Sequence, residues 1–503
     1  MDTTRVLLGC SIVAIASMTL LANSISGKEK ERKTLNTSPV VSEKGVEARS
    51  EEWARYYPRQ YETWKKTSES AEIEDLLEKK PQLAVLWAGY GFARDYNAPR
   101  GHFYAIQDNI NTLRTGAPAS PTTGPSPTAC WSCKSPDVPR LIEEVGEKEY
   151  FTGKWARFGS EVVNPVGCAD CHDSRTGNLV LNRPWLKNGL ETAGLKTDRI
   201  THQQMRSLVC AQCHSEYYFQ KSEETGANGE KQVINTVIFP WANGFAGENI
   251  EEYYDDMAFS DWTHAISKAP MLKAQHPDYE LYTTGIHGRR DVACADCHMP
   301  YVQEGSVKFS SHHIGNPLDD IDNTCLNCHQ EKEEEFRAVI KTKLDRKEEL
   351  MEMAMNGLAK AHLEAGRAWE ARATEAEMKD ILQDIRHGQW RWDYSIASHG
   401  SFFHAPEETL RLLASANNLA QEARLKLAAV LAGHGVIGYQ VPDFSTKEKT
   451  LALAGVDLQK EIAAKQQFKA TLVRKWEMEA VEKGRLHPDA RKGMSDRSSY
   501  SDN

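Results

Sequence analysis

The sequence of 503 residues predicts a mainly α fold with little β structure and long C-terminal helices. Residues 331–366 and 374–397 are rich in Glu, Lys, Ala, Leu and Met, which favour helices. By contrast, residues 115–129 are a cluster of Pro, Gly, Ser and Thr that can form neither a regular helix nor a central strand. We therefore expect irregular structure in the first part of the chain and long helices in the last third.

Composition excludes several classes of protein. A hydrophobic fraction of 40% is sufficient for a real core, so the chain is neither disordered nor fibrous. The net charge of -10 gives no basic surplus for binding nucleic acid. A mean hydropathy of -0.57 excludes a series of membrane spans. The remaining class is a large globular protein.

The N-terminus predicts export. An apolar run over 6–22 follows Arg5, and small residues precede a plausible cleavage site after Ser24. We expect residues 1–24 to form a signal peptide, with a retained membrane anchor as the alternative. Residues 25–50 are polar and aperiodic, which is typical of a flexible linker.

The next elements are taken in chain order. Apolar and aromatic residues at helical spacing predict two short helices over 51–98, split before Pro81. Five Cys-x-x-Cys pairs then fall within 130–329, at intervals that fit no tandem repeat. We therefore treat 51–330 as one irregular region that carries these pairs.

Helix signals organise the C-terminal region, 331–487, which we expect to belong to the same domain. A capping box at Thr374 and Glu377 predicts one helix start, and Ser445 with Glu448 predicts another, for a helix that reaches about residue 484. Between them, a helix should run from Pro406 to Gly433. The tail, 488–503, should be disordered.

Four of the cysteine pairs continue directly into histidine. This is the attachment pattern of c-type haem, in which two thioethers fix the porphyrin and the adjacent imidazole binds the iron. A zinc site does not require histidine after every second cysteine, and no thioredoxin-like pattern supports redox disulfides. The predicted haem residues are Cys168, Cys171 and His172; Cys210, Cys213 and His214; Cys294, Cys297 and His298; and Cys325, Cys328 and His329.

The fifth pair, Cys130 and Cys133, is followed by Lys134 instead of histidine. Alone, it would be a structural or redox cysteine pair. Beside four haem motifs, it predicts a fifth haem whose proximal ligand is an amine. Only the neutral amine has a lone pair for the iron, so the site must depress the pKa of this lysine.

With these motifs, the chain resembles the ammonia-forming cytochrome c nitrite reductases from about residue 55 to 480. The similarity also includes Arg114 and the segments 215–218, 240–241, 260–262, 270–277, 391–393 and 404–407. It implies a periplasmic homodimer with five covalently attached haem c groups, paired through the long helices. It also implies six-electron reduction of nitrite to ammonium at the lysine-ligated haem, with electrons from a multihaem or quinol-oxidising donor. Membrane association would come through that donor or through an uncleaved N-terminal segment.

Haems that only carry electrons need a second imidazole each, which closes the iron to substrates. His287 lies between Gly285 and Gly288, where small neighbours would let the backbone approach a porphyrin, and His404 lies just outside a predicted helix. By resemblance, the four distal ligands are His102, His287, His312 and His404. His313 is the alternative to His312, and the sequence does not say which distal histidine serves which haem.

The resemblance also implies the substrate pocket and a metal site. Arg114, Tyr217 and His276 are expected to supply a fixed positive charge, a hydrogen bond and protons to a bound anion. One calcium ion per monomer is expected on the carboxylate of Glu216, the carbonyl groups of Tyr217 and Lys273, and the side-chain oxygen of Gln275.

Two other functions are weighed against nitrite reduction. The chain could be a multihaem electron carrier whose fifth haem is structural or six-coordinate. It could also be a sibling enzyme that acts mainly on hydroxylamine, nitric oxide or sulfite. Lys134, together with Arg114, Tyr217 and His276, favours the nitrite reductase.

Overall fold

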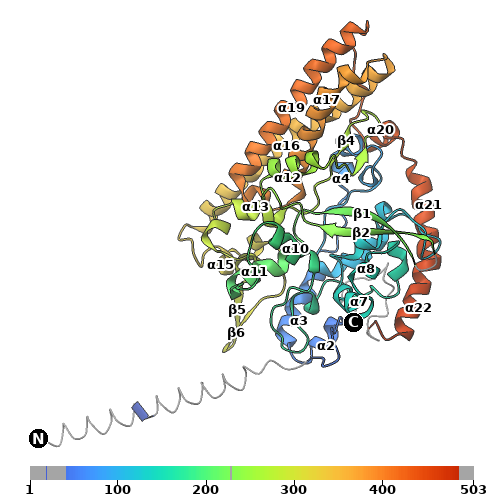
Figure 1. The fold of residues 1–503 in the computed structure, drawn as a ribbon. Helices are drawn as coiled ribbons and strands as arrows, with labels where there is room; N and C mark the ends of the chain where they lie inside the picture. Colours follow the sequence, from blue (N-terminus) through green and yellow to red (C-terminus); the bar gives the residue numbers. More distant parts are fainter. Residues whose placement is uncertain (1–17, 20–40, 227–228, 487–503) are drawn as a thin grey trace, which may run out of the picture.

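The computed structural model describes residues 18–19, 41–226 and 229–486. The predicted C-terminal tail lies outside these residues, as do most of the predicted signal peptide and most of the predicted linker. Within them, helices predominate and the strands form three two-stranded sheets, as expected for a mainly α fold (Figure 1). No helix among the described residues is both long and apolar enough to cross a membrane.

The N-terminal region consists of short helices joined by irregular segments. The split before Pro81 is confirmed, but the prediction of two helices over 51–98 is wrong, because four short α-helices form there. The α-helices are α2 (Ser50–Trp53), α3 (Pro58–Lys65), α4 (Leu76–Lys79), α5 (Gln82–Leu86), α6 (Ala105–Asn111), α7 (Asp137–Val145), α8 (Glu147–Tyr150), α9 (Cys168–Cys171), α10 (Pro184–Thr192), α11 (His202–Ala211), α12 (Gly247–Asp256), α13 (Asp278–Thr284), α14 (Cys294–His298) and α15 (Ile321–Thr324).

The strands are few and lie between the cysteine motifs. The longest pair, β1 (Tyr218–Thr225) and β2 (Lys231–Ile238), forms an antiparallel hairpin in which Tyr218 is opposite Ile238. Most of β1 is exposed, and its second half includes Glu223 and Glu224. The sequence of β1 therefore carries little of the apolar alternation that marks a strand. The other two pairs are β3 (Trp262–Thr263) with β4 (Pro270–Met271), and β5 (Tyr301–Glu304) with β6 (Val307–Ser310).

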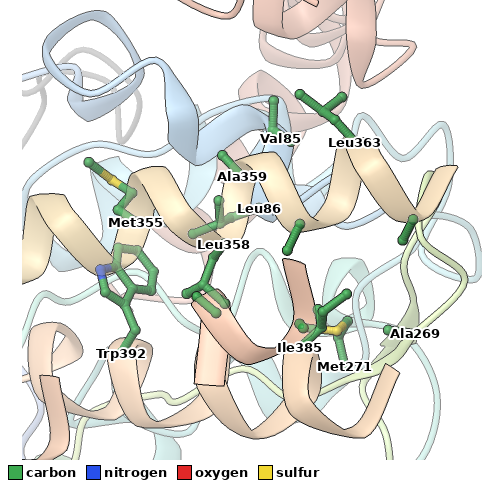
Figure 2. Close-up of a cluster of buried hydrophobic side chains, with 14 of the residues drawn as sticks. Val85, Leu86, Ala269, Met271, Met355, Leu358, Ala359, Leu363, Ile385 and Trp392 are labelled. Atoms are coloured by element: carbon green, nitrogen blue, oxygen red, sulfur yellow. The ribbon is translucent and has the colours of Figure 1, made fainter. Parts of the chain in front are cut away.

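Three long helices, α16 (Glu333–Glu370), α17 (Glu375–Ala397) and α19 (Pro406–Gly433), form a bundle that projects from the rest of the molecule (Figure 1). The capping box at Thr374 is confirmed, and α19 has the predicted bounds. The short helix α18 (Ser401–His404) joins α17 to α19. Figure 2 shows the bundle core, where Leu358, Met355 and Ile385 pack with Trp392 and with Leu86 of α5.

The predicted single helix after Ser445 is wrong. Thr446, not Ser445, caps α20 (Lys447–Leu453) by accepting a hydrogen bond from the backbone of Lys449. Gly455 then adopts a φ of +70°, which ends this helix. The chain continues as α21 (Leu458–Phe468), a π-helical turn (Lys469–Val473) and α22 (Arg474–Glu482).

Helices α21 and α22 run back along the N-terminal region (Figure 1). The contact is close, because a Cβ added to Gly159 would lie 2.1 Å from the ring of Trp476 on α22. A second core forms here around Trp131, Trp155 and Trp185, and Cys130 and Tyr217 pack against it. The lysine motif therefore lies at the edge of this second core.

Candidate active site

The Cys-x-x-Cys-His motifs fold as tight turns that present the imidazole. The backbone N–H groups of His172, His214 and His329 donate to the first cysteine of their motifs at 2.9, 2.9 and 3.0 Å. In the fifth motif, the N–H of Lys134 donates instead to Trp131, three residues earlier, at 2.9 Å. All ten described cysteines are free thiols in this structure, so each pair is available for thioether bonds.

Each histidine of the four motifs faces one of the predicted distal histidines. The ring centres of His172 and His312 are 6.1 Å apart, and His312, rather than His313, takes this position. The other pairs lie at nearly the same separation: His102 and His214 at 6.1 Å, His287 and His329 at 6.2 Å, and His298 and His404 at 6.2 Å.

This separation fits a metal ion between two imidazoles. Ligating nitrogens lie about 2 Å from a metal, and a ring centre lies about 1 Å behind its nitrogen, so two trans rings should be about 6 Å apart. Burial also lowers the pKa of His102, His312 and His404 to about 4, so these imidazoles are neutral and able to bind a metal. The pairs could therefore each hold a haem iron.

The space around the motifs also fits a large planar group. A cavity of about 840 Å³ is lined by Cys297, His298 and His313, which is within the usual size range of cofactor pockets. Both glycines beside His287 lie where two backbone segments meet closely. A Cβ on Gly285 would lie 1.7 Å from the carbonyl oxygen of His404, so this glycine allows two backbone segments to meet.

The outer nitrogens of the four motif histidines have different partners. His172 and His298 contact backbone carbonyl groups of Gly177 and Gly315 at 2.8 and 3.0 Å through Nδ1. The Nδ1 of His214 lies 3.2 Å from a carboxylate oxygen of Asp278. The fourth, His329, lies 3.6 Å from Glu331. Such partners orient a ligating imidazole and change its basicity.

Electrostatic effects link the predicted pocket residues to the fifth motif. Burial lowers the pKa of His276 well below its ordinary value, and the charge of Lys134 adds to this effect. Burial raises the pKa of Tyr217 well above its ordinary value, and the neighbouring Cys133 and Cys130 contribute. Burial raises the pKa of the Cys130 thiol to about 11, and the positive charge of Arg114 partly opposes this rise.

Arg114 lies on a 3-10 turn (Leu113–Thr115), and its guanidinium carbon is 4.2 Å from the ring centre of Phe92. Lys134 forms no ion pair with a carboxylate among the described residues, which is the arrangement expected of a lysine with a different partner. The residues predicted for this site would supply an amine, a fixed positive charge, a phenol and an imidazole.

The predicted calcium residues are brought together from two segments. The carboxylate of Glu216 accepts hydrogen bonds from the backbone of Gln275 at 2.6 Å and from the hydroxyl of Tyr254 at 3.1 Å. The side-chain amide of Gln275 lies 3.3 Å from the carbonyl oxygen of Lys273. No group of three or more His, Cys, Asp or Glu side chains suited to a metal occurs among the described residues, so a site here depends on carbonyl and amide oxygens.

Buried carboxyl groups near Glu216 fit a cation. Burial raises the pKa of Glu216 well above its ordinary value and that of Glu280 to about 8. The two residues are adjacent, because the backbone of Glu216 donates to Glu280 at 2.9 Å, and the second oxygen of Glu280 is buried without a hydrogen-bond partner. A divalent cation would stabilise the ionised forms.

Sequence reasoning missed three polar contacts around the site. The ammonium of Lys273 pairs with the buried Asp393 at 2.9 Å, although only the carbonyl of this lysine was expected to have a role. Asp278 and Lys465 were not singled out at all. Each acts on residues far away in the sequence, so no local motif marks it.

Comparisons with known proteins agree with this geometry. The family model for cytochrome c552 matches residues 49–486. Curated relatives named cytochrome c-552 are 63% identical in Desulfotalea psychrophila, over 99% of this chain and 98% of the relative, and 61% identical in Maridesulfovibrio salexigens, over 99% of each. A solved cytochrome c nitrite reductase from Desulfovibrio desulfuricans, described with two calcium sites in its catalytic subunit, is 30% identical, with a TM-score of 0.68 over 82% of this chain and 90% of that one. The chain therefore belongs to the cytochrome c552 family of cytochrome c nitrite reductases.

Proposed function

We propose that this protein is a periplasmic pentahaem enzyme that reduces nitrite to ammonium at a haem whose iron is bound by Lys134. Each turnover consumes one nitrite, six electrons and eight protons, and it yields one ammonium ion and two water molecules. The observation that carries this proposal is the lysine motif itself. Its amine lacks a carboxylate partner among the described residues, and the electrostatic effects that link its motif to Arg114, Tyr217 and His276 support a shared site.

The other four motifs hold haems that carry electrons. We assign the axial pairs as His172 with His312, His214 with His102, His298 with His404, and His329 with His287. The ring separations of 6.1 to 6.2 Å support this assignment. An iron held between two such imidazoles would be closed to substrate and suited to carrying electrons.

At the lysine site, the haem supplies electrons and an open iron position for nitrite. Arg114 provides a permanent positive charge for the oxygens of the anion, because a guanidinium stays protonated. Burial favours the neutral form of His276, whose ring N–H donates a hydrogen bond to the substrate. A proton taken up on its second ring nitrogen would let this N–H pass its own proton to a leaving oxygen. The hydroxyl of Tyr217 stays protonated and donates a further hydrogen bond.

A calcium ion is proposed on the carboxylate of Glu216, the carbonyl groups of Tyr217 and Lys273, and the side-chain oxygen of Gln275. Hard oxygen ligands of mixed type suit calcium. The ion would fix Tyr217 beside the iron, because this residue directly follows the carboxylate ligand. It would also fix His276, which directly follows Gln275.

The remaining assignments concern partners and location. We propose a homodimer formed through α16, α17 and α19, where Met353 and Leu425 are 49% and 73% exposed. The electrons come from a multihaem or quinol-oxidising donor. Residues 1–24 direct export to the periplasm, where the haems are attached.

The decisive experiment is an anaerobic assay of the purified protein with nitrite and a reduced viologen dye. Haem content is measured first, and five haems per chain are expected. Six electrons and one ammonium per nitrite would support the proposal. Electron uptake without ammonium would favour a sibling chemistry, and no uptake by protein with five haems would indicate an electron carrier.

A further inference from the structure

We propose that Lys465 is a positioning residue that fixes the turn carrying Arg114 for binding an anionic substrate; this inference rests on the proposed function. Lys465 lies on α21 and is 5% exposed. Its amine donates to the carbonyl oxygen of Ile110 at 3.0 Å, to the hydroxyl of Thr115 at 3.1 Å and to the carbonyl oxygen of Gly116. An ammonium has three donors, so these three acceptors saturate it.

The three acceptors lie on both sides of Arg114 in the sequence. The opposite side of the turn is held by Asp95, whose carboxylate accepts from the backbone of Leu113 at 2.8 Å. The backbone carbonyl of Asp95 also accepts from the guanidinium of Arg114 at 3.4 Å. The turn is therefore held between an amine and a carboxylate, and the guanidinium lies against Phe92.

Lys465 has no carboxylate within 4.0 Å among the described residues, so its hydrogen bonds go to the turn and not to an ion pair. Burial lowers the pKa of Lys465 to about 7, and Lys469 adds to this, whereas Asp95 and Glu461 oppose it. A buried amine without an ion-pair partner is expensive for stability. Such a residue is expected where it serves a specific contact.

The surroundings leave the turn little freedom to move. A Cβ added to Gly91 would lie 3.4 Å from Cβ of Arg114, so the chain packs directly behind the arginine. Gly116 has a φ of +74°, and a Cβ there would lie 2.5 Å from Pro125. Removing the three hydrogen bonds of Lys465 would therefore loosen the turn on the side that the amine holds, while Asp95 still holds the other side.

The test is Lys465→Met, a change that keeps the length of the side chain and removes its donors. We expect KM for nitrite to rise about tenfold, which corresponds to roughly one charged hydrogen bond, with a smaller change in kcat. The KM for hydroxylamine, which is uncharged at neutral pH, should change less than about twofold because no anion needs Arg114. A general structural defect would raise both KM values together and would overturn the proposal.

Two further variants separate the possible outcomes. Lys347→Met removes another buried lysine, on α16, that does not contact the turn, and both KM values should stay unchanged. Arg114→Gln should raise KM for nitrite at least as much as Lys465→Met. If Arg114→Gln has its effect and Lys465→Met has none, the inference is wrong while the proposed function stands. If Arg114→Gln has no effect, the role of Arg114 and the inference are both wrong. The proposed function itself fails only if the unsubstituted protein forms no ammonium from nitrite.

If Lys465→Met does not yield protein with five haems, a smaller change tests the role of Lys465. Thr115→Val keeps the shape of the side chain, removes one of the three acceptors and also removes the hydrogen bond that the hydroxyl donates to the carbonyl oxygens of Asn109 and Thr112. We expect KM for nitrite to rise about threefold and KM for hydroxylamine to stay constant. An unchanged KM for nitrite in this variant would overturn the role of Lys465.

Discussion

The helix bundle and the region of the cysteine motifs are stabilised in different ways. In the bundle, α16, α17 and α19 bury a continuous apolar core, and Leu358 and Ile385 are completely buried. Between 130 and 329, elements such as α9 and α14 are four or five residues long, too short to bury such a face. There a separate core around Trp131, Trp155 and Trp185 provides side-chain packing, and the haems of our proposal would cover the motifs, so substitutions in the two regions should have separable effects.

The largest effect is expected from Lys134→His, which changes chemistry without changing the bundle. Haem attachment should continue, because both cysteines remain, but nitrite turnover should fall by about 100-fold or more as the amine ligand is lost. Turnover and haem content are measured on the same preparation. Unchanged turnover with five haems would remove any special role for the lysine.

Leu358→Ala is expected to lower stability without changing catalysis. Its side chain is completely buried in the bundle core, so the free energy of unfolding should fall by about 2–5 kcal/mol. The haem spectrum and nitrite turnover of the folded protein should not change. Met478→Ala on α22, where the side chain is 62% exposed, is the matched control and should change stability by less than about 0.5 kcal/mol.

Stability of the bundle should also depend on pH through His362. Burial lowers its pKa to about 4, and its ring stacks on His264 with centres 3.7 Å apart. Because the unfolded histidine titrates near 6.5, the unfolded state binds more protons between these values. Stability should therefore fall by about 3 kcal/mol as pH drops from 6.5 to 4.

Denaturant unfolding at several pH values tests this dependence, with His362→Gln as the comparison. Glutamine does not titrate, so this variant should show a flatter profile over the same interval. An equally steep profile in both proteins would assign the effect to other groups.

The smallest effect concerns a contact between the two regions. Asp278 lies 3.2 Å from His214 in the motif region and accepts a hydrogen bond from Ser398, the C-cap of α17, at 2.6 Å. Asp278→Asn removes the negative charge behind the imidazole, so the reduction potential of the His214 haem should rise by roughly 50 mV. Spectroelectrochemical titration should show one shifted haem and unchanged bundle stability. Glu331→Gln, at the longer contact with His329, should produce a smaller shift.

Local signals in the sequence predicted the bundle well. The capping box at Thr374 and the helix from Pro406 to Gly433 depend on residues within one or two turns. The same kind of signal failed at Ser445, because Thr446 competes for the cap and Gly455 breaks the helix. The β1–β2 hairpin was missed because its first strand is mostly exposed and lacks apolar alternation.

The residues of the candidate site also divide into those with a local signal in the sequence and those without one. The cysteine motifs are local, so the sequence alone predicts where haem attaches. Arg114, Tyr217 and His276 were predicted only through a family resemblance, because nothing in their neighbouring residues marks them. Lys465 and Asp278 were not predicted, since a hydrogen bond between distant segments leaves no pattern in the sequence.

The contact between α21 and the Arg114 turn has a consequence for how the enzyme is made. Gly116 and Lys465 are 349 positions apart, so the turn leaves the ribosome long before the lysine that holds it. A chain that stops before α21 carries every Cys-x-x-Cys pair but lacks that lysine. If Lys465 has the proposed role, haem loading would not be sufficient for catalytic competence, and a truncated product that carries its haems should bind nitrite poorly.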